Sequence, residues 1–149
     1  MSIPLRELQF DLFEVLGLAQ SPSTRETFQA VLEAAARLAD EQFAPYAALA
    51  DRQEPYVEQG RVVLPVELSN AMRSLADGGF LAAPFAEEYG GLALPFSLSQ
   101  ACGSLFAAAN VGFHSYAMLT QGAANLLVHF GSEAQRDYWV PRMLAGRVY

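Results

Sequence analysis

The longest stretch without a charged side chain is the feature that most limits how this chain can fold. Residues 89–132 are 44 consecutive positions with no Asp, Glu, Lys or Arg, so all of the chain's charged side chains lie outside it. Helices that are apolar on every side are buried in a larger protein or inserted in a membrane. Here Gly, Ser, Gln, Asn, His and Thr interrupt the stretch every few positions, and no clean run of about 18 apolar residues exists for a membrane span. We therefore expect two helices buried in a larger assembly.

Composition narrows the class of protein further. The chain has 149 residues, of which 52% are hydrophobic and 17% charged, which suits one domain with a substantial core and excludes disorder. A net charge of −7 and the absence of lysine argue against nucleic-acid binding, a Schiff-base lysine and a P-loop. The single cysteine excludes a disulfide framework and a multi-cysteine zinc site. Charged residues near the start replace the apolar run of a secretion signal, so we expect a cytoplasmic protein.

Proline and glycine positions divide the chain into about six helical segments. Apolar residues recur at helical spacing in the expected helices, which cover residues 5–16, 23–43, 65–77, 97–109, 112–130 and a last segment from 132 onwards. Capping boxes are predicted at Ser23 with Glu26 and at Ser132 with Gln135, and Pro141 is expected to shorten or kink the last helix. Residues 51–63 are polar and irregular, which predicts a loop. No segment alternates as a strand does, so the predicted fold class is all-α, an orthogonal or up-and-down bundle without a sheet.

The acidic and glycine pairs of residues 87–91 do not form a recognisable site. Glu87 and Glu88 are adjacent, so their carboxylates diverge, whereas acid–base catalysis needs them to converge on a substrate. Gly90 and Gly91 lack the spacing of a nucleotide-binding loop. We expect a solvated loop in which the glycines supply positive φ for a tight turn.

The histidines, the cysteine and the nearby serine are not arranged for catalysis or metal binding. His114 and His129 lie about 22 Å apart along one predicted helix, so they cannot share a metal ion. A lone histidine on an apolar helix is usually a core residue or a pocket wall, and Cys102 falls on an apolar face that predicts a buried thiol. Ser115 cannot pair with His114 as a catalytic dyad, because adjacent helical residues do not face each other. Taken alone, the chain predicts no catalytic, cofactor-binding or metal-binding residue.

Three motifs together resemble the acyl-CoA dehydrogenase family. They occur in the family's order, and the resemblance extends over essentially the whole chain. The motifs are residues 43–51, residues 80–95 with the E-E-Y-G-G sequence, and residues 131–146 with the pattern G-x-x-x-Q-x-x-x-x-x-P-x-x-x-x-G. Three further segments, 4–16, 60–65 and 108–123, are similar to the branch of 3-methylmercaptopropionyl-CoA dehydrogenases. The resemblance implies an N-terminal helical extension at 1–20 and the family's N-terminal helical domain at 21–149.

The resemblance implies an FAD-dependent oxidoreductase that oxidises the Cα–Cβ bond of an acyl-CoA and passes electrons to an electron-transfer acceptor. In this family a carboxylate on a later helical domain removes the α-proton, and FAD, held mainly by a β-domain, accepts the β-hydride. Both domains would follow Tyr149. The 149-residue chain is therefore expected to be inactive alone, without catalytic base, bound FAD or metal, and the full enzyme to be a homo-oligomer without a membrane span or nucleic-acid partner.

Within this domain the resemblance implies a contribution to the wall of the acyl-tail pocket. The positions that match the family's lining sites are His114, Ser115, Met118, Leu119 and Gly122. Their offsets place them near one helix face, although ordinary core packing would explain the same pattern. Gly122 stands where the family often has a bulkier residue, which predicts a deeper or differently shaped tail cavity. Gly103 and Ser104 stand where many members have two glutamates, which puts any salt bridge there in doubt.

Two other hypotheses remain open at this stage. A stand-alone helical protein-interaction module would dock through an apolar face and would end at a stop codon after Tyr149, whereas a continuing frame with a Thr-Glu-Pro strand segment would favour the enzyme. A membrane-associated helical hairpin would make the purified protein dependent on detergent. Continuation of the reading frame is the observation that separates the first two.

Overall fold

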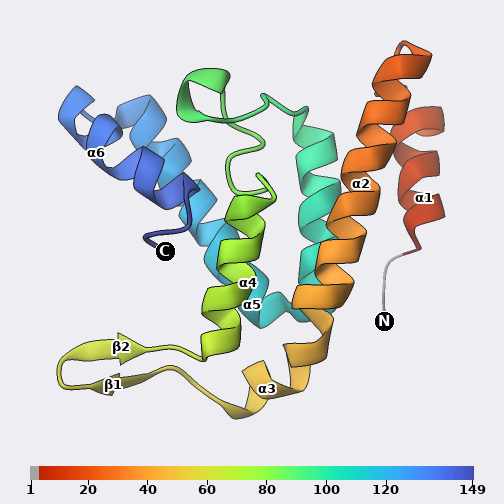
Figure 1. Cartoon of the computed structure of the whole chain (residues 1–149). Coiled ribbons are helices and arrows are strands. Elements are labelled where there is room, and N and C mark those ends of the chain that lie inside the picture. Colours follow the sequence, from red (N-terminus) through yellow and green to blue (C-terminus); the bar gives the residue numbers. More distant parts are fainter. Residues whose placement is uncertain (1–3) are drawn as a thin grey trace.

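The computed structural model describes residues 4–149, which form a mostly helical structure with one small hairpin (Figure 1). The regular elements are α1 (Leu5–Phe10), α2 (Pro22–Gln42), α3 (Ala47–Arg52), β1 (Tyr56–Glu58), β2 (Arg61–Val63), α4 (Val66–Asp77), α5 (Phe96–Phe130) and α6 (Glu133–Leu144). A π-helical turn (Asp11–Val15) continues α1, and short 3₁₀ turns occur at Ala44–Tyr46 and Glu87–Tyr89. The predicted extension at 1–20 is therefore described from residue 4 onwards.

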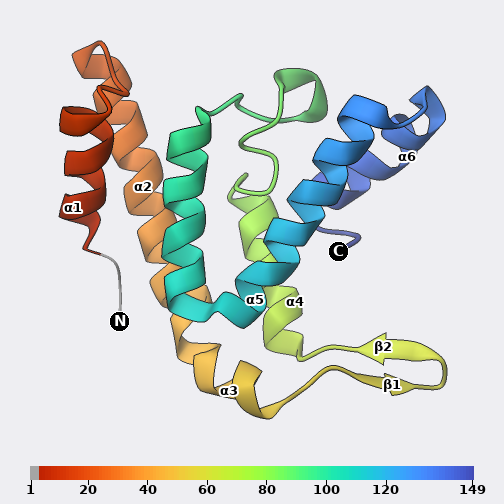
Figure 2. The same cartoon turned by 180° about the vertical axis from the view of Figure 1, so that it is seen from behind.

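Helix α5 is the longest element and is sharply bent at Asn110 (Figure 2). Its first half packs along α2, and its second half crosses α4, in front of it in the view of Figure 2, towards α6. Asn110 is buried and has extended backbone angles (φ −162°, ψ 93°), so helical geometry is interrupted at this one residue. The two helices predicted at 97–109 and 112–130 are the two halves of α5, joined without a loop.

The main core lies between α2, α4 and α5, with the segment after α1 packed onto it. Leu12 and Phe13 from that segment are buried, so residues 4–20 share the core of the rest of the chain. The ring of Phe43, at the end of α2, contacts Phe106 in the first half of α5 and Phe113 in the second. A smaller core joins α5, α6 and the segment after α4 through Ala82, Phe85, Ala124, Val140 and Leu144.

The prediction of no sheet is wrong, because β1 and β2 form an antiparallel hairpin within the predicted loop at 51–63. Tyr56 pairs with Val63, and the turn residues Gln59 and Gly60 both have positive φ, as a tight two-residue hairpin turn requires. Strands of three residues are too short to show an alternating pattern in the sequence. Both strands lie mostly exposed, outside the helical core.

The predicted division into about six helices is correct only in part. Helix α3 was not predicted, and Pro141 does not end α6, which continues to Leu144. The capping box of Ser132 with Gln135 is confirmed. The box predicted at Ser23 with Glu26 is wrong: Pro22 takes the first helical position, and Ser21 caps α2 by accepting a hydrogen bond from the Thr24 N–H at 3.2 Å. Within residues 4–149 no helix has the length and apolarity needed to cross a membrane.

Residues 80–95 connect α4 to α5 and are held by their own backbone. The N–H groups of Leu92 and Leu94 donate to the Ala83 carbonyl, and the Ala93 N–H donates to the Phe85 carbonyl at 2.8 Å. Gly90 has φ +80°, which confirms its predicted turn role. Gly91 has another reason to be glycine: a Cβ there would lie 1.9 Å from the Phe85 carbonyl oxygen.

Candidate functional site

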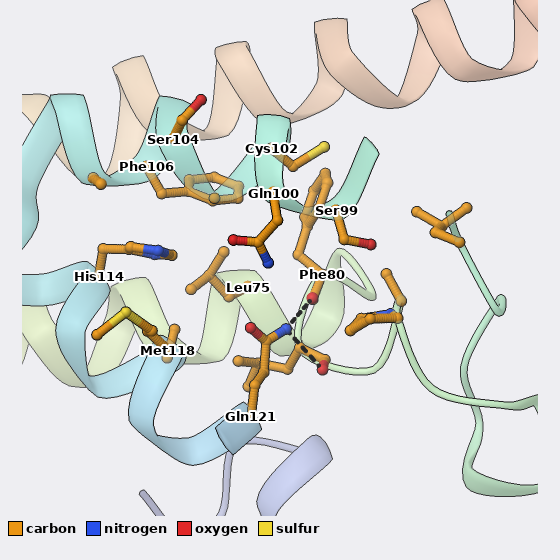
Figure 3. A pocket seen from close by; sticks show the side chains of 17 residues that line it. Leu75, Phe80, Ser99, Gln100, Cys102, Ser104, Phe106, His114, Met118 and Gln121 are labelled. Atoms are coloured by element: carbon orange, nitrogen blue, oxygen red, sulfur yellow. Dashed lines mark hydrogen bonds between the residues drawn. The ribbon is translucent and has the colours of Figure 1, made fainter. Parts of the chain in front are cut away.

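A partly enclosed cavity of about 300 Å³ lies between the end of α4, residues 80–84 and the two halves of α5 (Figure 3). The bend at Asn110 creates this space, because it turns the second half of α5 so that it faces the first half across a gap. The volume falls at the lower end of the range found for small-molecule pockets. The described residues therefore form a ligand-sized space within this chain alone.

The walls of the cavity are mostly apolar and carry no formal charge. Among the described residues that line it there is no Asp, Glu, Lys or Arg. The polar or sulfur-containing side chains on the wall are Ser99, Gln100, Cys102, Ser104, His114, Met118 and Gln121. An uncharged wall of this kind suits a neutral, largely apolar group.

His114 is the titratable side chain that reaches furthest into the cavity, as Figure 3 shows. Its ring stacks on Phe106 with the centroids 6.1 Å apart. Burial lowers the pKa of His114 below its ordinary value of 6.5, so the imidazole is neutral at pH 7. Its Nδ1 is buried and has no hydrogen-bond partner among the described residues.

Three other polar side chains have clear structural roles. The Gln121 amide nitrogen donates to the carbonyls of Phe80 (3.0 Å) and Leu81 (3.1 Å), which fixes the far wall of the cavity to α5 (Figure 3). Ser104 donates to the Ala101 carbonyl at 2.7 Å, within the same helix. The prediction of a buried thiol at Cys102 is confirmed, and burial raises its pKa to about 11, so it is a poor nucleophile.

The five residues predicted to line a tail pocket divide between two sides of α5. His114 and Met118 line the cavity, whereas Ser115, Leu119 and Gly122 do not. Leu119 is 67% exposed, and a Cβ at Gly122 would have no neighbour within 4 Å. Several apolar residues lie exposed on this second side, which we call the outer face of α5: Val111, Leu119, Leu126 and Phe130. Met118 lines the cavity but is 54% exposed, so it lies at the edge between the two sides.

The turn at residues 87–91 offers little to an anionic ligand. Glu87 and Glu88 are both exposed, as expected for a solvated loop. The Gly90 N–H donates to the Glu87 carbonyl and the Gly91 N–H to the Ala86 carbonyl, so these amides are already occupied. Within residues 4–149, no group of three or more His, Cys, Asp or Glu side chains is placed so that it could hold a metal ion.

Sequence reasoning missed several cavity residues, of which Ser99, Gly103 and Gln121 matter most. The Gln121 amide bonds to backbone 40 and 41 positions away, and nothing near it in the sequence indicates that partner. Ser99 and Gly103 lie on the first half of α5, and the direction they face depends on the bend at Asn110. The sequence indicates these residues only weakly, through the recurrence of small and polar residues within an otherwise apolar helix.

Residues 25–147 match the sequence family described as acyl-CoA dehydrogenase, N-terminal domain. The chain is also 31% identical over 154 aligned positions to 3-methylmercaptopropionyl-CoA dehydrogenase of Ruegeria pomeroyi, an alignment that covers 97% of this chain and 26% of the relative. The chain thus spans about a quarter of the length of that relative.

Proposed function

Because the chain belongs to the acyl-CoA dehydrogenase family, we propose that it is the N-terminal helical domain of an FAD-dependent enzyme that oxidises the Cα–Cβ bond of an acyl-CoA thioester. The observation that carries this proposal is the family match over residues 25–147. Residues 1–20 would form a helical extension, and residues 21–149 the domain itself. The name of the Ruegeria relative adds short thioether-containing acyl groups to the substrates to be tested.

Within that enzyme, the outer face of α5, together with His114 and Met118 beside it, would form part of the wall around the acyl tail. The residues assigned to the wall are His114, Ser115, Met118, Leu119 and Gly122. Two observations support the assignment: residues 89–132 carry no formal charge, and the outer face exposes large apolar side chains to solvent. An exposed apolar surface of this kind marks a site of interaction, and an alkyl tail gains about 0.8 kcal/mol for each methylene that it buries there.

The catalytic base and the flavin site would lie in other parts of the enzyme, so this chain alone would be inactive. FAD, when bound, supplies the hydride acceptor. The one glycine turn considered for a phosphate group, Gly90 with Gly91, does not fit FAD, because both amides are bonded within the turn. The chain's own residues would exclude water from the tail and set its path. We also propose an electron-transfer protein as acceptor, a homo-oligomeric enzyme and a cytoplasmic location.

Expression of the complete reading frame tests the proposal directly. We expect a yellow protein with a flavin absorbance spectrum that oxidises acyl-CoA thioesters, measured with an artificial electron acceptor across increasing tail lengths and with 3-methylmercaptopropionyl-CoA. The 149-residue chain expressed alone should be colourless. A frame that stops after Tyr149, together with a colourless product, would overturn the enzyme hypothesis and favour an interaction module.

Substitution of Gly122 by leucine tests the assignment of the tail wall. A leucine side chain would take the space of about two methylenes, each worth about 0.8 kcal/mol. We expect kcat/KM for the longest accepted tail to fall by about tenfold, with shorter tails spared. Ala134→Leu is the matched control, since Ala134 is also small and exposed but lies on α6, away from the assigned residues on α5. An identical tail-length profile for both variants and the parent enzyme would refute the assignment.

A further inference from the structure

The cavity behind α5 is separate from most of the proposed tail wall and belongs to this chain alone. Ser115, Leu119 and Gly122 lie outside it, and its walls come from α4, residues 80–84 and both halves of α5. Its volume is about 300 Å³. A cavity of about half that size, 150 Å³, already holds benzene in another protein. A one-ring or two-ring molecule therefore has room here whether or not the wider enzyme activity is correct.

The electrostatic character of the cavity excludes charged ligands. None of the described lining residues is Asp, Glu, Lys or Arg. His114 is neutral at pH 7, and the Cys102 thiol stays protonated. An ion that entered would lose its hydration and gain no counter-charge, which is strongly unfavourable. The occupant must be neutral.

Two buried polar atoms at the cavity wall have no partner, although their neighbours are satisfied. The Oγ of Ser99 and the Nδ1 of His114 lack hydrogen bonds among the described residues, whereas the Gln121 amide and the Ser104 hydroxyl are paired. Buried polar groups are nearly always hydrogen-bonded, so such exceptions need a reason. A neutral imidazole can exchange its donor and acceptor nitrogens. Nδ1 is closed off from the cavity and would stay unpaired, so a ligand that either donates or accepts would pair with His114 through Nε2.

Gly103 keeps the Nε2 of His114 uncovered. A Cβ at position 103 would lie 3.5 Å from this nitrogen, in ordinary contact, and any larger side chain would reach over it. The φ of Gly103 is outside the left-handed region, so the backbone does not need glycine here. Glycine inside a helix is unfavourable relative to alanine. Its presence is explained by the space that it leaves beside His114.

We propose that this cavity binds a small, uncharged, mostly apolar molecule that carries one hydrogen-bonding group, with the imidazole of His114 as its polar partner. The apolar body of the ligand would fill the gap between Phe80, Phe106 and Leu75. Its polar group would meet Nε2 in the space left by Gly103. Neutral phenols and indoles have this combination of size, polarity and lack of charge.

Nuclear magnetic resonance of the full chain tests the proposal with three probes of similar size: p-cresol, toluene and benzoate. The imidazole protons of His114 report binding, and those of the exposed His129 serve as an internal reference. We expect saturable shifts of His114 with p-cresol, about fivefold weaker binding of toluene because it lacks the hydroxyl, and no binding of benzoate. Absence of a saturable shift with p-cresol, or equal binding of benzoate, would overturn the proposal.

Matched variants assign the binding to this cavity. Gly103→Leu should abolish p-cresol binding, whereas Ala108→Leu, the same side chain at an exposed position of the same helix, should leave it unchanged. If circular dichroism shows that Gly103→Leu is unfolded, Gly103→Ala decides, with weaker p-cresol binding expected in a chain at least as stable as the parent. His114→Phe should remove the preference for p-cresol over toluene. Undiminished p-cresol binding in the Gly103 variants would refute the site.

Discussion

Replacement of Asn110 by alanine tests whether this residue stabilises the bend of α5. The Asn110 Oδ1 accepts a hydrogen bond from the Phe113 N–H at 3.1 Å and so caps the second half of the helix, a role worth about 1 kcal/mol. Its Nδ2 donates to the Phe43 carbonyl at 3.3 Å. The Phe43 carbonyl also accepts a hydrogen bond from the Tyr46 N–H, so removal of the Asn110 amide does not leave it unpaired. Loss of the amide therefore costs one hydrogen bond, about 1 kcal/mol. We expect Asn110→Ala to lower the free energy of unfolding by about 2 kcal/mol.

Urea unfolding followed by circular dichroism measures this loss, which corresponds to a fall in Tm of about 4–8 °C. Asn110→Ser keeps an uncharged oxygen that can cap the helix but removes the amide donor, so about half the loss is expected. Asn125→Ala, at an exposed position of the same helix, should change the stability by less than about 0.5 kcal/mol. The reasoning fails if Asn110→Ala is as stable as the parent, or if the serine variant is as unstable as the alanine variant.

Three further predictions concern single residues. Gly91→Ala should destabilise the fold by about 3 kcal/mol, because the new Cβ would collide with backbone atoms. Gly90→Ala should cost about 1 kcal/mol, because the residue has a positive φ. A larger loss of stability in Gly90→Ala than in Gly91→Ala, measured by urea unfolding, would contradict this. Burial raises the pKa of Cys102 to about 11 from an ordinary 9.0, which lowers its thiolate fraction at about pH 8 roughly 100-fold. Mass spectrometry should therefore show far slower alkylation of the native chain than of the urea-unfolded chain. Equal alkylation rates would be inconsistent with burial. Burial lowers the pKa of His114 in the folded chain, so the unfolded chain binds a proton at this residue more readily. The fold is therefore unaffected by His114 above about pH 6.5 and loses stability as the pH falls through that value towards the folded pKa. His114→Phe should flatten this part of the stability–pH curve, and an unchanged curve would argue against the prediction.

Local patterns in the sequence predict the parts of the fold that depend on nearby residues. Leu68, Met72 and Leu75 form the inner face of α4 as their helical spacing indicates, and all three are buried. The capping box of Ser132 with Gln135 is equally local, since both partners lie within one turn. Such features need no knowledge of the rest of the chain.

Long-range partners explain what the sequence does not predict. The bend of α5 depends on Asn110 meeting a carbonyl 67 positions earlier, and Asn occurs too often inside helices and turns to indicate such a contact. Helical spacing places Met118 and Leu119 near one face, but it does not say which face the fold covers. Met118 lies at the cavity, while Leu119 is 67% exposed on the outer side.

The bend of α5 also affects how quickly the candidate site can form. Two of the cavity walls, at residues 99–107 and 114–121, belong to one helix and are connected through Asn110 without an intervening loop. Closing such a short segment costs little chain entropy, and contacts between residues close in sequence form fast. We therefore expect the two α5 walls to meet early in refolding, and the wall at residues 80–84 to dock afterwards through Gln121.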